Sequence, residues 1–381
     1  MHNFLYITYV DYRQKAFPGV EAKIDGQIGA LRQAGYHVDR VNQFGAAAQL
    51  VNCVSGEAGL FEAASSRFAI LAAVKAALSR KTYLGAYIRF QFFSEDVRRM
   101  LSLLKKQGVR VVLEIPTYPY DGELKQQGPK GYLKLLCDSL FKPACVRKID
   151  RITTVSDDRQ IFGVPCINIL NGLDYSALPL RQVRQPDPQE LHLIAVASMQ
   201  PWQGYDRLLE GLADYYRQEQ PVRVVAHLIG DGVSLPGYRK FVSSNGLEDC
   251  VHFYGQLDRQ GIRRVADGCD LAVGALGTFR RGGVTKLSTL KSREYCALGF
   301  PSVNATPTDI LDPNDPCCLY IPEDASPVDI PRVVEFYQDV YFRSGKTAEE
   351  VALSVREKAM ALSDSAVVFR CVIDYFVNTR K

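Results

Sequence analysis

The chain has 381 residues, of which 47% are hydrophobic and 23% are charged. This composition is typical of a soluble globular protein, and the length suits two domains. No apolar run reaches the roughly 18 residues that a membrane-spanning helix needs, and no basic leader precedes the first predicted strand. The sequence therefore predicts a cytoplasmic protein. Its formal net charge of +4 says little about partners, and no nucleic acid is expected among them.

The ten cysteines include no C-x-x-C pair, and no histidine stands at zinc-finger spacing from a cysteine pair. Most of them lie in apolar segments, such as Cys166 in VPCINIL and Cys269 in DGCDLAV. We interpret them as small core residues in a reducing compartment. No metal site is expected.

The first half of the chain alternates predicted strands and helices. Phe4–Val10 is an apolar, β-branched run typical of a buried strand, and Gly19–Ala34 has apolar residues at helical spacing. Further strands are predicted at His37–Val41, Tyr83–Phe90, Val109–Ile115, Arg151–Val155 and Cys166–Leu170, with a helix at Glu95–Gln107 and a helix start at Asp157–Asp158. Strand–helix–strand order predicts a parallel sheet.

A proline-bearing stretch, Ala177–Pro188, is the predicted linker, and a second alternation follows it. Its strands are predicted at Leu191–Ala197, Val222–Ile229, Val251–Tyr254, Leu271–Gly274 and Ser302–Asn304, and its helices at Asp206–Gln218, Tyr238–Asn245, Arg259–Asp267 and Lys291–Leu298. The fold class is therefore α/β, with Rossmann-like domains at 1–175 and 176–365 and a helix within 366–381. Ligands of such sheets bind beyond the carboxyl ends of the strands.

Two glycine-bearing loops follow strands of the second half. ASMQPWQG ends at Gly204 just before a helix, and free amide groups at a helix start favour phosphate. LIGDG contains Asp231 and Gly232, where small residues let the backbone approach a ligand. Each loop alone is also what an ordinary tight turn looks like.

The most informative segment runs from Gly274 to Asn304. Arg280, Lys286, Lys291 and Arg293 precede Glu294 early in an apolar helix. Cations beside a helix start suit a diphosphate, and a carboxylate one turn further can accept hydrogen bonds from ribose hydroxyls. The alternative is that the cations are solvated and that Glu294 is a capping or salt-bridged residue.

The ordered set of motifs resembles bacterial family 4 glycosyltransferases of the GT-B, retaining class. The matching pieces are GVEAKIDGQIGAL, LEIPTYPYDGE, NGLD, ASMQPWQGYDRLLEGL, LIGDG, VHFYGQL and LKSREYCALGFPSV. The resemblance implies two Rossmann-like domains with a cleft between them, and a C-terminal helix that crosses back to the first domain. It also implies transfer of a sugar from a UDP-sugar or GDP-sugar to a glycan or lipid-linked acceptor in surface polysaccharide synthesis, with no metal requirement.

The resemblance also implies roles for particular residues. Glu294 stands at the family's carboxylate for the donor ribose, and the donor site is expected to include Gly19, Gly204, Asp231, Gly232, Lys286 and Arg293. Arg280 and Lys291 are the expected catalytic cations, because the family's Arg and Lys positions are Ser198 and Gln203 here. Tyr118, Asp121 and Glu123 are the polar candidates on the acceptor side.

These departures leave a second hypothesis open. Lys286 replaces the first of the family's two carboxylates, so the chain is alternatively a catalytically silent GT-B subunit that binds a sugar or a partner. A sugar-nucleotide epimerase fits LKSREYCALG less well. A dinucleotide-dependent dehydrogenase is disfavoured because no G-x-G-x-x-G follows the first strand.

Charge is concentrated between Arg98 and Arg151, where 12 basic and 5 acidic residues leave +7. Apolar residues are interleaved with these cations at Tyr132, Leu133, Leu135, Leu136, Leu140 and Phe141. A basic, amphipathic surface can rest on anionic headgroups, which predicts peripheral contact at the inner face of the membrane. The simpler alternative is that these apolar residues form the core face of one helix.

Overall fold

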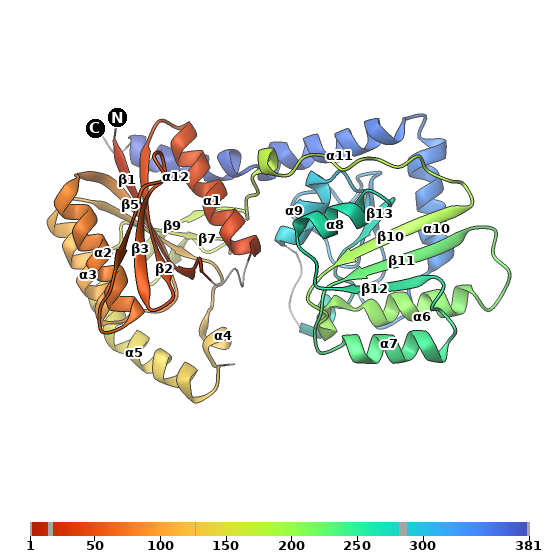
Figure 1. Cartoon of the computed structure of the whole chain (residues 1–381), viewed down its shortest axis with the longest axis horizontal. Coiled ribbons are helices and arrows are strands. Elements are labelled where there is room, and N and C mark those ends of the chain that lie inside the picture. The colour runs from red at the N-terminus through yellow and green to blue at the C-terminus, as the bar shows by residue number, and fades with distance from the viewer. Residues whose placement is uncertain (1, 14–17, 126, 282–287, 379–381) are drawn as a thin grey trace. The chain divides into compact units, whose positions relative to one another are not determined.

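The computed structural model describes residues 2–13, 18–125, 127–281 and 288–378. The chain divides into two compact units, Met1–Asp174 with Ser365–Lys381, and Tyr175–Asp364. Each unit is a mainly parallel sheet with helices packed against it (Figure 1). The predicted α/β class with two successive Rossmann-like folds is therefore confirmed.

The first unit is built on a nine-stranded sheet of order β4-β3-β2-β1-β5-β6-β7-β9-β8. The strands are β1 (Asn3–Asp11), β2 (His37–Phe44), β3 (Ala47–Asn52), β4 (Ala58–Phe61), β5 (Tyr83–Arg89), β6 (Arg110–Ile115), β7 (Arg151–Thr154), β8 (Gln160–Ile161) and β9 (Val164–Asn168). The central strands pair in parallel, whereas β3, β4 and β8 run antiparallel to their neighbours. The carboxyl ends of β5 and β6 therefore lie at the same edge.

Helices cover both faces of this sheet. They are α1 (Pro18–Gln33), α2 (Ser66–Arg80), α3 (Glu95–Lys106), α4 (Asp121–Lys125), α5 (Pro129–Val146) and α12 (Ser365–Asn378). Helix α12 packs the C-terminal segment of this unit against its N-terminal segment. Its Phe369 and Phe376 rings lie 4.9 and 4.7 Å from those of Tyr87 and Phe4. The last helix of the chain is thus part of the first unit's core.

The prediction that a helix begins at Asp157–Asp158 is wrong. The side-chain amide of Asn168 donates to the carbonyls of Ser156 and Asp158, which holds a loop there. Phe162 and Gly163 then have φ of 56° and 78° and turn the chain into the β8–β9 hairpin. Polar residues that often cap a helix here stabilise a turn instead.

One surface of α5 is apolar and exposed. Tyr132, Leu133, Leu136 and Leu140 are 60–71% exposed, while Leu135 and Phe141 pack against the core from the same helix. The simpler alternative, that all these residues form a core face, is therefore wrong for the four exposed ones. We call Tyr132, Leu133, Leu136 and Leu140 the α5 ridge.

The second unit contains a six-stranded parallel sheet of order β12-β11-β10-β13-β14-β15. Its strands are β10 (Glu190–Val196), β11 (Arg223–Ile229), β12 (Val251–Gly255), β13 (Leu271–Val273), β14 (Ser302–Asn304) and β15 (Cys318–Tyr320). Its helices are α6 (Tyr205–Tyr215), α7 (Leu235–Ser244), α8 (Arg259–Ala266), α9 (Leu290–Ala297), α10 (Ile330–Gln338) and α11 (Ala348–Ser363). No helix within the described ranges is long and apolar enough to cross a membrane.

Candidate functional site

The carboxyl edge of the second sheet is closed by the loops that follow β10, β11 and β13. The amide of Met199 donates to the carbonyl of Asp231 over 2.9 Å, and the carbonyl of Met199 accepts from Ser234 over 2.9 Å. The amide of Leu276 donates to the carbonyl of Gln203 over 2.8 Å. These bonds join the three loops into one surface at the edge where ligands of parallel sheets bind.

Close backbone contacts explain two of the predicted glycines. Gly204 has φ of +68°, and a Cβ there would lie 2.4 Å from the amide nitrogen of Gly277. A Cβ on Gly232 would lie 2.6 Å from the carbonyl oxygen of Met199. The exposed carboxylate of Asp231 accepts the amide hydrogen of Gly232 over 2.7 Å. In this structure these residues serve contacts within and between the loops.

Helix α9 is tied to the same edge. Thr289 caps it by accepting the amide hydrogen of Ser292 over 3.2 Å, as a side chain at a helix start commonly does. The hydroxyl of Tyr295 accepts from the amide of Val196 over 2.7 Å and donates to the carbonyl of Val273 over 3.3 Å. The helix is thereby fixed to the ends of β10 and β13.

Lys291 reaches from α9 to the loop after β10. Its Nζ donates to Oε1 of Gln203 over 2.6 Å and to the hydroxyl of Tyr205 over 3.2 Å. Within the described part of the chain it has no carboxylate partner, and burial lowers the pKa of Lys291 to about 7. Its ammonium therefore lies beside Gln203, the position at which the family resemblance expects a cation.

Glu294 lies one helical turn after Lys291, so the two side chains leave the same face of α9. No hydrogen bond or ion pair to its carboxylate is formed by the part of the chain that the structure describes. Burial raises the pKa of Glu294, an effect that the positive charge of Arg259 partly opposes. A half-buried carboxylate without a partner is suited to accept hydrogen bonds from a ligand.

The two arginines predicted for the donor site, Arg280 and Arg293, form ion pairs with carboxylates of the chain. Arg280 holds both carboxylate oxygens of Asp206, at 2.9 and 2.6 Å, and donates to the carbonyl of Pro201 over 2.7 Å. Arg293 is fully buried and its Nη2 lies 2.7 Å from Oδ2 of Asp309, which is 2% exposed. Arg280 thus braces the loop after β10, and Arg293 lies in the interior rather than at the ligand edge.

The remaining predicted residues are scattered. Gly19 is in the first turn of α1, and Lys286 lies outside the described residues. Tyr118 packs edge-on against Phe162, with ring centroids 5.8 Å apart. Asp121 is exposed at the start of α4; Glu123 is in the same helix, and its side chain lies outside the described part. Neither Tyr118 nor Asp121 lines the pocket at the carboxyl ends of β5 and β6.

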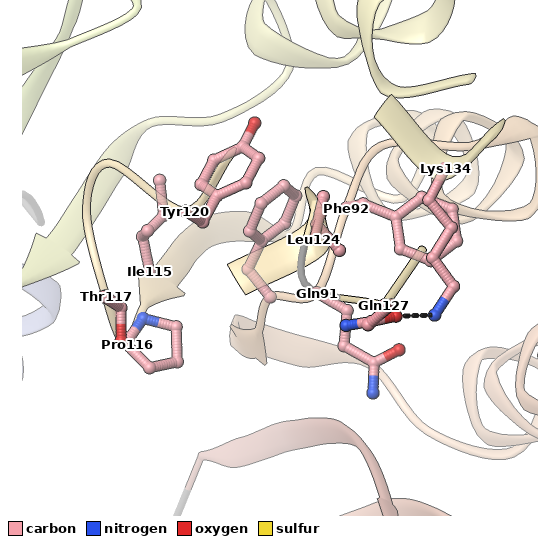
Figure 2. Close-up of a pocket in the computed structure, with 10 residues that line it drawn as sticks. Gln91, Phe92, Ile115, Pro116, Thr117, Tyr120, Leu124, Gln127 and Lys134 are labelled. Atoms are coloured by element: carbon pink, nitrogen blue, oxygen red, sulfur yellow. Dashed lines mark hydrogen bonds between the residues drawn. The ribbon is translucent and has the colours of Figure 1, made fainter. Parts of the chain in front are cut away.

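A pocket of about 230 Å³ does lie at the carboxyl edge of the first sheet, where β5 and β6 end (Figure 2). It is lined by Phe90, Gln91, Phe92, Ile115, Pro116, Thr117, Tyr120, Leu124, Gln127 and Lys134. Sequence reasoning missed these residues because they come from four separate segments with no common motif. The sequence indicated only where such a pocket could lie, namely at the carboxyl end of a parallel strand.

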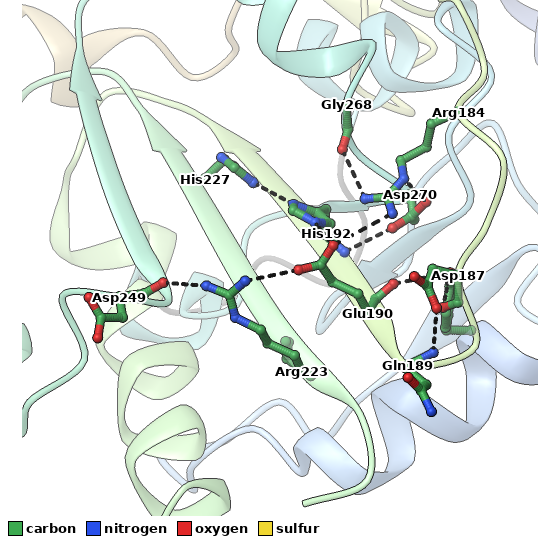
Figure 3. Close-up of polar contacts among 12 residues, drawn as sticks. Arg184, Asp187, Gln189, Glu190, His192, Arg223, His227, Asp249, Gly268 and Asp270 are labelled. Carbon is green, nitrogen blue, oxygen red and sulfur yellow. Dashed lines mark hydrogen bonds and ion pairs between the residues drawn. The ribbon is translucent and has the colours of Figure 1, made fainter.

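A second polar cluster gathers around Glu190 and His192 at the amino end of β10, and it includes His227 further along β11 (Figure 3). Nε2 of His192 lies 3.0 Å from Glu190, whose carboxylate also pairs with Arg223 at 3.0 Å. His192 also bonds the ring of His227 over 2.9 Å, and burial lowers the pKa of His227 to about 4. Asp270 accepts the amide hydrogen of His192 over 2.8 Å. His192 and His227 also line a pocket of about 480 Å³ together with Gly261 and Val265 of α8.

No protein-family model and no curated protein matches the sequence. Several solved structures share its fold. HepE of Anabaena in complex with UDP is 13% identical, with a TM-score of 0.59 over 99% of this chain and 100% of that one. For sucrose-phosphate synthase from Thermosynechococcus elongatus the identity is 15%, the TM-score 0.61 and the coverage 100% and 99%. A glycosyltransferase from Rickettsia africae is 10% identical, with a TM-score of 0.64 over 100% and 99%. Over its whole length, the chain therefore has the GT-B fold of these glycosyltransferases.

Proposed function

We propose that this chain transfers a sugar from a nucleoside diphosphate sugar to a glycan or lipid-linked acceptor. The observation that carries the proposal is the pairing of Lys291 and Glu294 on one face of α9. A nucleoside diphosphate offers what both groups lack, negative phosphates for the ammonium and ribose hydroxyls for the carboxylate. The UDP bound to HepE of Anabaena supports a UDP-sugar as the first donor to test.

In this proposal the protein positions the donor and stabilises charge that grows on the leaving diphosphate. Lys291 supplies the positive charge, and Arg280 keeps the adjoining loop in place through Asp206. The resemblance of LKSREYCALG to family 4 supports a retaining hexosyl transfer, in which the departing phosphate acts as the base. A UDP-sugar or GDP-sugar would then react without a metal ion, and EDTA should leave turnover unchanged.

Glu294→Gln should weaken binding of the nucleotide-sugar by about 1–3 kcal/mol, because a charge-assisted bond to the ribose is replaced by a weaker one. Calorimetry with a UDP-sugar panel measures this, and GDP-sugars form the second panel. Glu248→Gln, an exposed glutamate of the same unit, is the matched control. Equal affinities of Glu294→Gln and the unchanged protein would remove the carboxylate from the donor site.

We also propose that α5 holds the first unit on an anionic membrane at the cytoplasmic face. The α5 ridge leaves four large apolar side chains exposed, and the exposed Lys125 and Lys130 lie near the start of the helix. Apolar side chains flanked by cations suit the boundary between acyl chains and anionic headgroups. Lys142 contributes less, because it is paired with Asp138 at 2.9 Å.

Replacing Lys125 and Lys130 together by glutamine should lower partition onto anionic liposomes about 30-fold, because each cation near the surface adds about 1 kcal/mol, or about fivefold. Leu136→Ser with Leu140→Ser should lower it further, whereas Lys75→Gln on α2 should not. Co-sedimentation measures each variant on anionic and neutral vesicles, and salt should weaken binding by screening. Binding that ignores lipid charge, or none at all, contradicts the proposal.

A further inference from the structure

We infer that the pocket beside β5 and β6 binds a single sugar that carries a phosphate or carboxylate group. This inference rests on the proposed function, because it names the acceptor class that the first unit takes. The pocket of about 230 Å³ is smaller than the roughly 300–1,000 Å³ of sites that enclose larger ligands. It therefore suits one ring rather than an oligosaccharide.

The apolar part of the pocket is formed by closely packed, buried aromatic rings. Phe90 and Tyr120 are about 5% exposed, and their rings meet edge-on with centroids 5.2 Å apart. Phe90 also packs on Phe93 at 4.6 Å. The hydroxyl of Tyr120 donates to Asp138 over 2.9 Å, so it is occupied. Fixed aromatic surfaces suit the C–H faces of a sugar ring and lose little entropy on binding.

The polar part of the pocket is neutral except for one cation. Gln91, Thr117 and Gln127 bring amide and hydroxyl groups to the pocket, which can bond sugar hydroxyls. The amide oxygens of Gln91 and Gln127 already accept from Arg67 and Lys134 over 3.3 and 2.7 Å. None of the ten lining residues is acidic. Nζ of Lys134 is held by Oε1 of Gln127 over 2.7 Å and lies 5.7 Å from the Phe92 ring (Figure 2). The charge balance therefore favours an anionic substituent on the sugar.

Close packing of two helices sets the position of Lys134. A Cβ on Gly131 would lie 1.7 Å from the carbonyl oxygen of Leu124, so the first turn of α5 fits tightly against α4. This contact keeps Lys134 on α5 next to Gln127, which follows α4. Lys134 follows Leu133 of the α5 ridge in sequence but lies about 100° further around the helix. The pocket and the ridge are therefore on different faces of α5.

The test compares four probes by calorimetry: methyl glucoside, glucose 1-phosphate, glucuronate and inorganic phosphate. The two anionic sugars should bind at least tenfold more tightly than methyl glucoside or phosphate alone. Lys134→Gln should abolish that preference, and Lys106→Gln, an exposed lysine on α3, should preserve it. A fifth probe, glucose 1-phosphate esterified to a ten-carbon alcohol and presented in micelles, then identifies the source of the anionic sugar. Tighter binding of this probe than of glucose 1-phosphate indicates a lipid-borne acceptor, and equal or weaker binding indicates a free sugar phosphate.

Equal binding of neutral and anionic sugars, or a preference that survives in Lys134→Gln, overturns the inference. If inorganic phosphate binds as tightly as glucose 1-phosphate, the pocket recognises the anion and not the sugar, and the inference is also overturned. Nucleotide-sugar binding to the second unit is measured in the same samples. Donor binding without the sugar preference defeats only this inference, whereas sugar binding without any donor binding defeats the proposed function.

Discussion

Lys291→Gln should lower turnover with a nucleotide-sugar about 100- to 1,000-fold, the range for losing one group that stabilises transition-state charge. Affinity for the bare nucleoside should stay within about twofold, because the nucleoside carries no diphosphate. The reason lies in the contacts of Lys291, whose ammonium has, among the residues that the structure describes, only the neutral Gln203 and Tyr205 as hydrogen-bond partners. Steady-state kinetics at saturating donor gives the first quantity and calorimetry the second.

The contact with Gln203 provides a sharper control. Moving the charge, in the double variant Gln203→Lys with Lys291→Gln, places an ammonium on the other side of the same hydrogen bond. We expect this variant to recover at least tenfold in turnover over Lys291→Gln alone. Lys240→Ala, an exposed lysine on α7, should behave as the unchanged protein. Equal turnover of Lys291→Gln and the unchanged protein would show that the cation lies elsewhere.

The same residue predicts how donor affinity depends on pH. Burial lowers the pKa of Lys291 to about 7, and a bound diphosphate favours the protonated form and raises that pKa again. Above pH 7, binding therefore takes up a proton, and affinity falls by up to about tenfold per pH unit until the raised pKa is passed. A UDP-sugar itself has no phosphate group that titrates there. Calorimetry in buffers of different ionisation enthalpy counts the proton, and Lys291→Gln should lose it.

Arg293→Met should destabilise the second unit by about 3–5 kcal/mol, because it leaves the carboxylate of Asp309 buried without its cation. The pair is 2.7 Å apart, with side chains 0% and 2% exposed. Urea unfolding followed by the fluorescence of Trp202, the only tryptophan, reports on this unit.

The matched control is Arg293→Met with Asp309→Leu. An apolar pair of similar volume leaves no buried charge, and such replacements are often close to neutral. The double variant should therefore be more stable than Arg293→Met alone. A single variant that loses less than about 1 kcal/mol would contradict a structural role for the pair.

Sequence patterns were sufficient to predict most of the parallel strands in the two sheets. They were insufficient to predict helix α2 and the antiparallel strands β3 and β4. The strands at Phe4–Val10 and Leu191–Ala197 were recognisable because buried parallel strands are continuous apolar runs. Helix α2 was missed because its alanines and apolar residues surround the helix without a clear periodic face. The β3–β4 meander was missed because its strands are short and mixed in polarity.

The candidate donor site was predictable as a segment, but not in its contacts. Lys291 and Glu294 follow from their helical spacing and the family resemblance, whereas the bond from Lys291 to Gln203 joins residues 88 positions apart. Spacing also could not separate Arg293, which points into the core, from Lys291, which does not. The pocket beside β5 and β6 depends on tertiary packing of these strands with α4 and α5, so no local sequence pattern predicts it.

Release of nucleoside diphosphate from a nucleotide-sugar tests the central claim most directly. The chain is incubated with each UDP-sugar and GDP-sugar in the absence of acceptor, beside Lys291→Gln and Glu294→Gln. We predict slow hydrolysis of at least one donor by the unchanged protein and markedly slower hydrolysis by both variants. A donor that binds but is released intact at the same rate by all three proteins would contradict the account and identify a catalytically silent subunit instead.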